Sequence, residues 1–412
     1  MNQTQTKASS GTAVVAASLL TGVNQLLVNV QPLLFGVLAV RLGLDDAELG
    51  YLGAVVIAAL TLGSISGPFW VRRANWRLIC ALALVGAAAA FALGAVATTL
   101  DSALLIFGAA GLFLGLLSPP AFGCLGEAEN PPRAFAISVV AQSSLAAAST
   151  LALSFAIIPR FGAPGAFVSV AVAVAAALPL CRSLPRGAGS TRELSATVDG
   201  APLLSCAAIP AYAMLFAKGV FVAGILGYWI FVERIGVAHG IPGERIGLTI
   251  SLCAVASAAS AGIVGWLAGR VRLVAMIAIG TTIVIGAFMA LGVPGFLAFA
   301  LSNFLFAFGW GFAQSAYWGL LREVDATNRL FVAGPAAAGV GGVAAGMAAG
   351  PIIGAAGLPA MTLASGVALS AAALIAFLVA GSLRVRRSRT AGVDTRTPER
   401  NDQTLCPRGE AV

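Results

Sequence analysis

Long apolar stretches recur along almost the whole chain, and each is about as long as a helix that crosses a membrane. Such a helix needs ~20 mostly apolar residues to span the ~30 Å hydrocarbon core of a bilayer. Apolar types make up 59% of the 412 residues and charged types only 10%, which is more apolar surface than a soluble core could bury. The sequence therefore predicts an all-α polytopic membrane protein with twelve transmembrane helices. The stretches lie at about 13–39, 48–71, 78–99, 103–125, 134–158, 164–182, 204–232, 243–268, 273–292, 295–320, 331–354 and 358–381.

A polar segment separates the first six stretches from the last six. It contains Arg186, Arg192, Glu193 and Asp199 among Gly, Ser and Thr, so it is too polar to span a bilayer and too short to fold alone. We expect it to be a linker between two six-helix halves. The predicted divisions are an N-terminal half at 1–182, a linker at 183–203, a C-terminal half at 204–381 and a disordered tail at 382–412.

Basic residues gather on one side of this predicted topology. That side carries both termini and the linker, whereas the opposite side has only Arg41, Arg160, Arg234 and Arg245. The positive-inside rule therefore predicts that both termini and the linker are cytoplasmic. Short loops and Ala- and Gly-rich spans fit a bacterial inner membrane. Because the basic residues form no compact patch, the net charge of +8 does not indicate nucleic-acid binding.

Short motifs repeat between the two predicted halves at a nearly constant offset. Agreement of several motifs in one register predicts that the halves are parallel structural repeats. The three pairs are Glu127-Ala-Glu129-Asn-Pro-Pro-Arg133 with Glu323-Val-Asp325-Ala-Thr-Asn-Arg329, Gly162-Ala-Pro164 with Gly357-Leu-Pro359, and Gly67 to Arg72 with Gly265 to Arg270.

This architecture resembles that of the major facilitator superfamily of secondary transporters, over nearly the whole chain. In the family's motif between helices two and three, Gly67 and Arg72 match, whereas Val71 stands where Asp is usual. A second likeness is Gly346-Met-Ala-Ala-Gly-Pro-Ile-Ile-Gly354, which resembles the Gly-rich signature of the family's drug exporters but lies in the eleventh stretch instead of the fifth. Close helix packing is the alternative explanation for these small residues.

The resemblance implies a monomer in a lipid bilayer that moves a small-molecule substrate by alternating access without a cofactor. It also implies that helices one, four, seven and ten line the central pathway. The six cysteines show no metal-ligand spacing, and no phosphate-binding loop is present, so we predict neither a metal site nor ATP-driven transport. The one histidine, His239, has no Ser/His/Asp constellation around it in the sequence, which argues against an enzyme.

Lys218 is the only charged residue deep inside an apolar stretch. A charge at mid-membrane costs about 2.5–3.5 kcal/mol on insertion scales, so such a residue is functional by default. We predict that its ammonium group faces the central cavity, where it binds an anionic group of the substrate or exchanges a proton. The alternative is a lysine that bonds to neighbouring carbonyl groups or is neutral.

Amide and aromatic side chains mark three stretches as further substrate-binding candidates. Those on the first stretch fall within one half of the helix surface, and those on the tenth fall within about 60° of one another. Interhelical polar contacts and aromatic packing are the alternatives. The candidates are Asn24, Gln25, Asn29 and Gln31 on the first stretch, Asn303, Trp310, Gln314 and Tyr317 on the tenth, and Gln142 on the fifth.

Charged residues at the cytoplasmic ends of the predicted helices form a candidate gate. We expect them to make salt bridges when the cavity is closed to the inside and to break them when it opens. Solvated loop charges and helix caps are the alternative. In the fourth stretch, Ser118-Pro119-Pro120 should bend or interrupt the helix. The candidate gate consists of Arg72, Arg73, Glu127, Glu129, Arg133, Arg270, Glu323, Asp325 and Arg329.

These features predict a secondary active transporter for a small organic solute, and Lys218 indicates an anionic or carboxylate-bearing one. No Asp or Glu lies at a mid-span position, so coupling to a proton would use Lys218, Glu233 or Glu127. A facilitator or an exchanger is the alternative to proton coupling. A drug or metabolite efflux antiporter of the same fold and a non-transporting membrane sensor are the alternative functions.

Overall fold

The computed structural model describes residues 11–71, 73–129, 131–187, 209–267, 269–325, 330 and 333–394. Within these residues the chain is helical and has no strand. Ten helical stretches in this part of the chain are long and apolar enough to cross a membrane. The predicted all-α polytopic membrane protein is confirmed. Most of the predicted linker lies outside the described residues, so the boundaries of the predicted halves stay a prediction.

The helices follow one another with short connections. The first part contains α1 (Gly11–Leu42), α2 (Asp46–Ile65), α3 (Gly67–Trp70), α4 (Trp76–Gly94), α5 (Leu100–Gly115), α6 (Ser118–Gly126), α7 (Pro131–Leu151), the π-helix η1 (Ala152–Ile157), α8 (Ile158–Ala175) and the 3₁₀ helix η2 (Leu178–Ser183). The second part contains α9 (Ile209–Trp229), α10 (Val232–Ala238), α11 (Gly243–Leu267), α12 (Leu273–Ala290), α13 (Phe296–Val324) and α15 (Gly334–Asp394). The helix α15 runs past residue 382, where we expected a disordered tail to begin; residues 395–412 lie outside the described part.

Two of the spanning stretches are about twice as long as one crossing needs, and each is interrupted by a glycine with non-helical geometry. Gly162 has φ 59° and Gly357 has φ 76°, a region that residues with a Cβ rarely adopt. A proline follows each glycine at the start of the next helical segment. The repeated motifs Gly162-Ala-Pro164 and Gly357-Leu-Pro359 thus make the same kind of turn. Dividing both stretches at these glycines leads to the predicted twelve spans, a number that stays a prediction.

Polar caps and prolines set other helix boundaries. The first turn of α2 carries a capping box, in which Glu48 N donates to Asp45 Oδ1 at 2.8 Å and Asp45 N donates to Glu48 Oε2 at 2.9 Å. Between α5 and α6 the helix is interrupted directly before Pro119 and Pro120. A proline inside a helix removes a backbone donor and clashes with the preceding turn. The predicted interruption of the fourth span is therefore confirmed.

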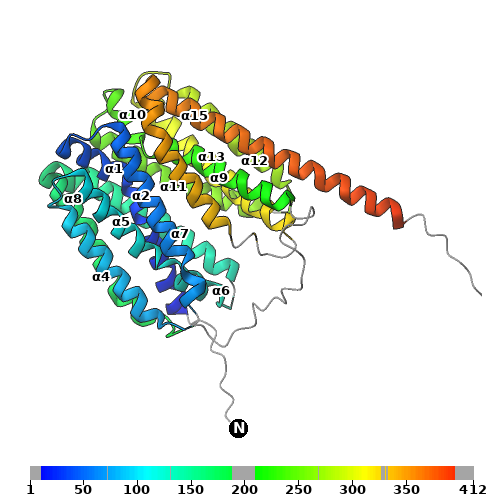
Figure 1. Cartoon of the computed structure of the whole chain (residues 1–412), viewed down its shortest axis with the longest axis horizontal. Coiled ribbons are helices and arrows are strands. Elements are labelled where there is room, and N and C mark those ends of the chain that lie inside the picture. Colours follow the sequence, from blue (N-terminus) through cyan, green and yellow to red (C-terminus); the bar gives the residue numbers. More distant parts are fainter. Residues whose placement is uncertain are drawn as a thin grey trace, which may run out of the picture.

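The helices pack in two groups that follow the chain (Figure 1). In the first group α1 packs on α6 and α7, α2 on α5, and α4 on α5 and α8. In the second group α9 packs on α15, and α13 packs on α11 and α12. The groups touch chiefly through α2 against α15 and α7 against α11. We call the end of the molecule with α10 the α10 end, and the opposite end, with α6, the α6 end (Figure 1).

Small residues make the contact between α2 and α15. A Cβ added to Gly346 would lie 2.6 Å from the carbonyl oxygen of Gly50, and one added to Gly350 would lie 2.5 Å from Cβ of Ala47. These distances leave no room for larger side chains, so the two backbones approach closely. In this structure the Gly346–Gly354 motif lets two helices pack, as the packing explanation predicts.

Large apolar side chains point outward from several helices. Leu82, Phe216, Leu297, Leu374 and Phe377 are each more than half exposed. A soluble monomer rarely presents apolar residues over so much of its surface, whereas a bilayer offers apolar lipid chains to cover them. The outer faces of these helices therefore fit a hydrocarbon environment.

Candidate functional site

A cavity of about 80 Å³ lies between the two groups of helices, about halfway along α1 and α13. Residues of α1, α7, α9, α11 and α13 line it. Three of the predicted candidates, Asn29, Gln142 and Trp310, face this space. A volume of this size holds only a few water molecules. The cavity is therefore nearly closed in this conformation.

The four candidate amides of α1 have different surroundings. Asn24 Nδ2 donates to the Leu114 carbonyl of α5 at 2.8 Å, and Gln25 Nε2 donates to Asn24 Oδ1 at 3.0 Å. Asn29 lines the cavity. Gln31 is fully buried, and neither polar atom of its amide has a hydrogen-bond partner among the described residues. The structure thus brings one of the four to the cavity, while Asn24 connects α1 to α5 and Gln25 bonds to Asn24 within α1.

Asn303 on α13 is held by hydrogen bonds inside the second group. The Tyr228 hydroxyl donates to Asn303 Oδ1 at 2.9 Å, and Asn303 Nδ2 donates to the Phe299 carbonyl at 2.9 Å. The residue is fully buried and does not line the cavity. Its amide positions α9 against α13 in this conformation.

Lys218 on α9 is almost completely buried, with 1% of its surface exposed. Its ammonium group donates to Gln314 Oε1 of α13. It also lies over three aromatic rings, with Nζ to centroid distances of 5.2 Å to Phe221, 5.9 Å to Tyr317 and 4.8 Å to Trp318. No described carboxylate forms a salt bridge with it.

The surroundings of Lys218 are separate from the central cavity. Gln314 lies one helical turn beyond Trp310, the last residue of α13 that lines the cavity. Gln314 and Trp318 are only half-buried, so the lysine lies behind side chains that reach the surface. Tyr317 is buried, and its hydroxyl has no hydrogen-bond partner among the described residues. The structure therefore joins Lys218, Gln314 and Tyr317 in one cluster next to the cavity.

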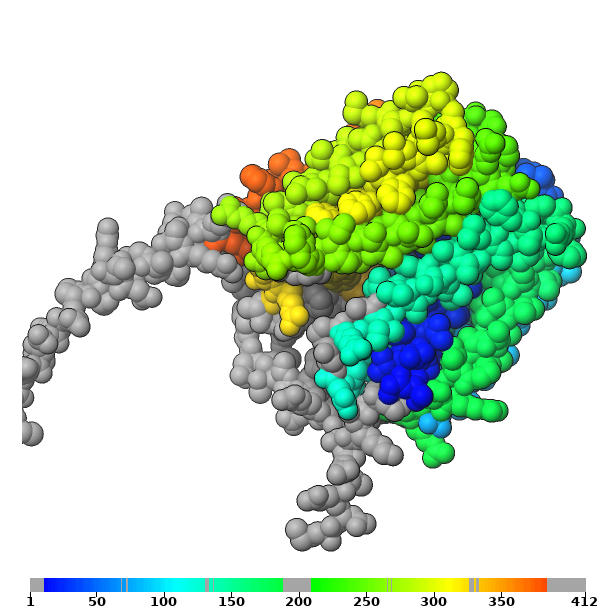
Figure 2. Space-filling model, turned by 180° about the vertical axis from the view of Figure 1, so that it is seen from behind, coloured from blue at the N-terminus to red at the C-terminus, as the bar shows by residue number. Residues whose placement is uncertain are grey.

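Polar contacts hold the two groups of helices together toward the α10 end. Figure 2 shows the groups touching at one end and spreading toward the other. The contacts are Arg234 Nε with Asp46 Oδ1 at 3.0 Å, Trp229 Nε1 donating to the Val28 carbonyl at 2.9 Å, and the hydroxyls of Thr150 and Ser251 at 2.6 Å.

The candidate gate lies at the α6 end. Arg72 and Arg329 are outside the described residues. Arg73, Glu127, Glu129, Arg133, Arg270 and Glu323 are exposed, whereas Asp325 is buried. Arg270 Nη1 donates to the Trp266 carbonyl at 2.9 Å. The gating role of these residues stays a prediction, and the salt bridge between the two groups lies at the opposite end.

Comparison with known proteins identifies the fold but no near relative. No family model matches the sequence, and no curated protein matches it significantly. A mutant of the nucleoside transporter NupG matches with a TM-score of 0.70 at 13% identity, over 90% of this chain and 99% of that chain. The chain has the major facilitator superfamily fold.

Two other solved structures share this major facilitator fold with the chain. A bacterial homologue of the human lysosomal transporter Spinster, in an inward-facing and occupied conformation, matches with a TM-score of 0.64 at 16% identity, over 89% of this chain and 95% of its own. A structure from work on substrate recognition in proton-dependent oligopeptide transporters matches with a TM-score of 0.69 at 14% identity, over 92% of this chain and 99% of that chain. At these identities the likeness shows the fold alone.

Several residues that join the two groups in this major facilitator fold are not among the candidates that the sequence predicts. Thr150 and Ser251 are small hydroxyl residues within apolar stretches. Such residues commonly form hydrogen bonds between helices, so the sequence did contain a signal for this pair. Trp229 and the pair of Asp46 and Arg234 depend on contacts between distant segments. Among the described residues, no group of three or more His, Cys, Asp or Glu side chains is placed to hold a metal ion.

Proposed function

We propose that this protein is a secondary transporter that moves a small organic solute across a membrane by alternating access. The observation that carries the proposal is the cavity between two groups of helices, lined from both groups within the major facilitator fold. A site at such an interface can be exposed to one side and then to the other as the groups rock against each other. The similar structures are transporters rather than enzymes, which supports a role without chemical turnover.

We assign the α6 end to the cytoplasm and the conformation to an inward-facing state that is nearly closed at the cavity. Arg41 and Arg234, two of the arginines on the sparsely charged side, lie at the α10 end, together with the polar contacts between the groups. The N-terminal end of α1 and the exposed charges of the candidate gate lie at the other end. This distribution supports cytoplasmic termini under the positive-inside rule.

The environment of Lys218 supports an anionic solute. An ammonium group has three donors, and Lys218 uses one of them on Gln314 while the others face aromatic rings. A cation in such an apolar place gains strongly from an anionic partner. We propose that a carboxylate of the solute replaces Gln314 as the partner of Lys218 when the cavity opens. Asn29, Gln142 and Trp310 then bind the rest of the solute.

The test is solute counterflow in proteoliposomes that contain the purified full chain. The labelled probes are succinate and benzoate as anions, tetraethylammonium as a cation, uridine as a neutral nucleoside, and dialanine as a zwitterionic peptide. We expect saturable flux of an anion, and we expect Lys218→Ala to abolish it while the protein still inserts in the membrane. Arg322→Ala, which removes an exposed charge at the α6 end, is the matched control and should retain flux.

Two results would change this proposal in different ways. Uridine or tetraethylammonium flux that persists in Lys218→Ala would keep transport and contradict anion recognition. Absence of flux for every probe class would contradict transport and favour a membrane sensor. An efflux antiporter of the same fold is distinguished by net movement of tetraethylammonium out of the cytoplasmic side against an imposed proton gradient.

The remaining expectations concern the setting of transport. We propose a bacterial inner membrane, a monomer, and a proton as the coupling ion, which the likeness to a proton-dependent transporter supports. Proton coupling is tested in the same proteoliposomes by imposing a pH gradient and adding an uncoupler. Loss of accumulation with the uncoupler supports coupling, whereas unchanged accumulation contradicts it.

A further inference from the structure

A second and larger cavity lies at the α10 end, apart from the central one. Its volume is about 700 Å³, within the range of about 300–1,000 Å³ that is usual for small-molecule sites. Residues of α1, η1, α8, α10 and the start of α11 line it, so both groups of helices contribute. No residue in the described part of the chain lines both cavities. We call this space the vestibule.

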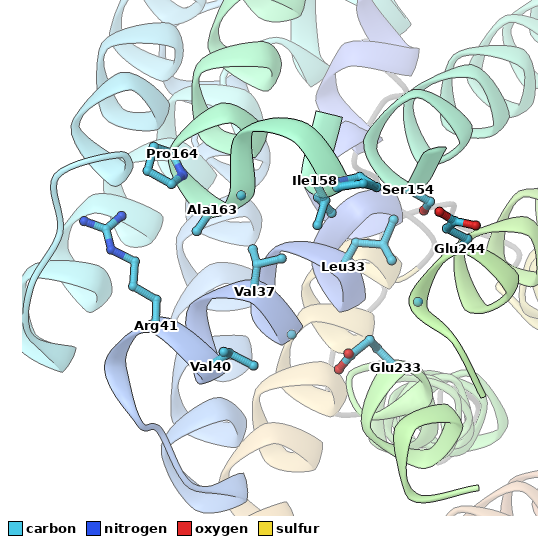
Figure 3. A pocket seen from close by; sticks show the side chains of 14 residues that line it. Leu33, Val37, Val40, Arg41, Ser154, Ile158, Ala163, Pro164, Glu233 and Glu244 are labelled. Atoms are coloured by element: carbon cyan, nitrogen blue, oxygen red, sulfur yellow. The ribbon is translucent and has the colours of Figure 1, made fainter. Parts of the chain in front are cut away.

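Most of the vestibule wall is apolar, and its acidic groups lie on one side. Leu33, Val37 and Ile158 form part of the apolar wall, while Glu233 and Glu244 come from the second group of helices. Figure 3 shows the two glutamates on one side of the vestibule and the guanidinium of Arg41 turned away on the other. An apolar wall beside acidic groups matches an amphipathic molecule that carries a positive charge.

Glu233 is the acidic group of the vestibule that has a buried carboxylate oxygen. It packs against α1, where a Cβ added to Gly36 would lie 2.6 Å from either carboxylate oxygen. Its Oε2 is buried and has no hydrogen-bond partner among the described residues. The neighbouring Arg234 is turned to Asp46, with which it forms the salt bridge. A buried carboxylate oxygen without a hydrogen-bond partner among the described residues makes binding of a cation favourable.

Arg41 does not supply the missing partner. Its Nη1 donates to the Ala95 carbonyl at 2.7 Å, which holds the guanidinium toward the connection between α4 and α5. Ser154 of η1 also lines the vestibule, and its buried hydroxyl has no hydrogen-bond partner in the described part of the chain. The vestibule therefore offers two carboxylates and an unused hydroxyl to a ligand.

We propose that the vestibule binds an amphipathic organic cation. Its positive group lies at Glu233, with Glu244 adding to the negative potential, and its hydrocarbon part lies on Leu33, Val37 and Ile158. This site is separate from the central cavity and does not depend on which solute the protein transports. Because both groups of helices line the vestibule, a bound cation also favours the conformation in which the α10 end is closed.

The test is equilibrium dialysis of labelled tetraphenylphosphonium against the purified full chain in detergent. We expect saturable binding that weakens about tenfold or more in Glu233→Gln, because the partner charge is lost. Glu244→Gln should weaken it less, since this residue is exposed. Asp101→Asn, an exposed carboxylate in the first turn of α5 outside the vestibule, is the matched control and should bind as the parent does.

A second variant separates the shape of the vestibule from its charge. Val37→Trp fills the space while it keeps both glutamates, and it should also abolish binding. Each variant is compared with the parent by gel filtration and thermal unfolding to show that it is folded. Neutral triphenylphosphine oxide, a probe of similar shape, should bind weakly and equally to the parent and to Glu233→Gln.

The Lys218→Ala and Glu233→Gln variants distinguish cation binding at the vestibule from solute transport through the central cavity. Tetraphenylphosphonium binding that survives Lys218→Ala and is lost in Glu233→Gln supports the vestibule, whatever the flux assays show. Binding that is lost in Lys218→Ala and kept in Glu233→Gln would place the cation in the central region and overturn the vestibule site. No saturable binding to the parent would overturn it as well.

Discussion

At the residue scale, the buried amides differ in how many of their hydrogen bonds are made. The amide oxygen and nitrogen of Asn303 both form hydrogen bonds within the second group of helices. In the first group, the amide nitrogen of Asn24 donates to the Leu114 carbonyl and its oxygen accepts from Gln25. Gln31 is equally buried and uses neither. An amide with both groups unpaired destabilises the conformation that buries it, whereas a satisfied amide stabilises it.

Gln314→Ala and Asn24→Ala should therefore have different effects, although the sequence alone predicts that both lower solute affinity. Loss of Gln314 removes the acceptor that positions the Lys218 ammonium group at the edge of the cavity, so we expect the KM for flux to rise several-fold. Stability should fall as well, because the buried ammonium group is left without this hydrogen bond. Loss of Asn24 leaves the Leu114 carbonyl without its donor and should cost about 0.6–1.7 kcal/mol of stability. Flux kinetics and thermal unfolding on the same samples check both. A KM change confined to Asn24→Ala would contradict this assignment.

Gln31→Leu should stabilise the conformation described here. The substitution removes two unpaired polar atoms at nearly constant volume, which is worth about 1–3 kcal/mol when a buried group lacks its hydrogen bonds. We expect a higher melting temperature in detergent and slower flux, since the opposite conformation gains nothing from the change. Gln25→Leu is the matched control: it removes a hydrogen bond that is made, so its melting temperature should not rise.

At the element scale, the two glycine turns and the π-helix set the paths of the longest helical stretches. Gly162 and Gly357 supply a backbone geometry that no other residue adopts without strain. The π-helix η1 places Ser154 at the vestibule, and π-helical turns often occur at functional sites. Residues at two of these helix breaks, Ser154 and Gly162, thus line the vestibule.

Gly357→Ala should destabilise the protein because alanine is strained at φ 76°. With ψ 177° this is a backbone region that almost only glycine adopts, and holding another residue there costs about 1–3 kcal/mol. Gly354→Ala is the matched control, since Gly354 is helical and nothing lies within 4 Å of an added Cβ there. Thermal unfolding of the two variants should show a lower melting temperature for Gly357→Ala only. Equal melting temperatures would show that the turn relaxes without cost.

The sequence predicts features that depend on neighbouring residues in the chain, but it predicts only part of the candidate sites. The apolar spans and the Pro119-Pro120 interruption depend on residues close together in the chain, whereas the Gly-x-Pro pairs are visible only as repeated motifs and their turns are seen in the structure. The roles of Asn24 and Asn29 depend on which way α1 is rotated and on what surrounds it. Because α1 packs on α5, α6, α7 and α8, its polar half faces protein as well as cavity. The spacing of polar residues in the sequence predicts which residues share a face of a helix, but it does not predict which helix or cavity that face contacts.

At the scale of the whole molecule, the asymmetry of contacts between the two groups is the main structural fact. The salt bridge between Asp46 and Arg234 and the hydrogen bond from Trp229 to Val28 lie toward the α10 end. An exposed or half-exposed ion pair contributes at most about 1 kcal/mol. If two conformations are similar in stability, a free-energy difference of this size is enough to change their populations. Small changes at these residues should therefore shift the populations measurably.

Asp46→Asn should increase the population that is open at the α10 end. The pair is partly exposed, with side-chain exposures of 33% for Arg234 and 23% for Asp46, so a shift of several-fold is expected and a complete switch is not. Spin labels at Val40→Cys and Val237→Cys, both exposed near this end, report the separation of the two groups. The charge-reversed pair Asp46→Arg with Arg234→Asp should restore the parent distance. An unchanged distance in Asp46→Asn would show that the pair does not bias the equilibrium.

The glycine contact between α2 and α15 limits how this protein can evolve. Gly50 and Gly346 lie so close that a single added carbon meets the opposite backbone. Every amino-acid replacement of a glycine enlarges the side chain, so no one-step mutation at these positions preserves the spacing. Divergence in this line of descent should concentrate on the lipid-facing side chains and the cavity walls, while the two facing glycines change only together with a shift of a whole helix.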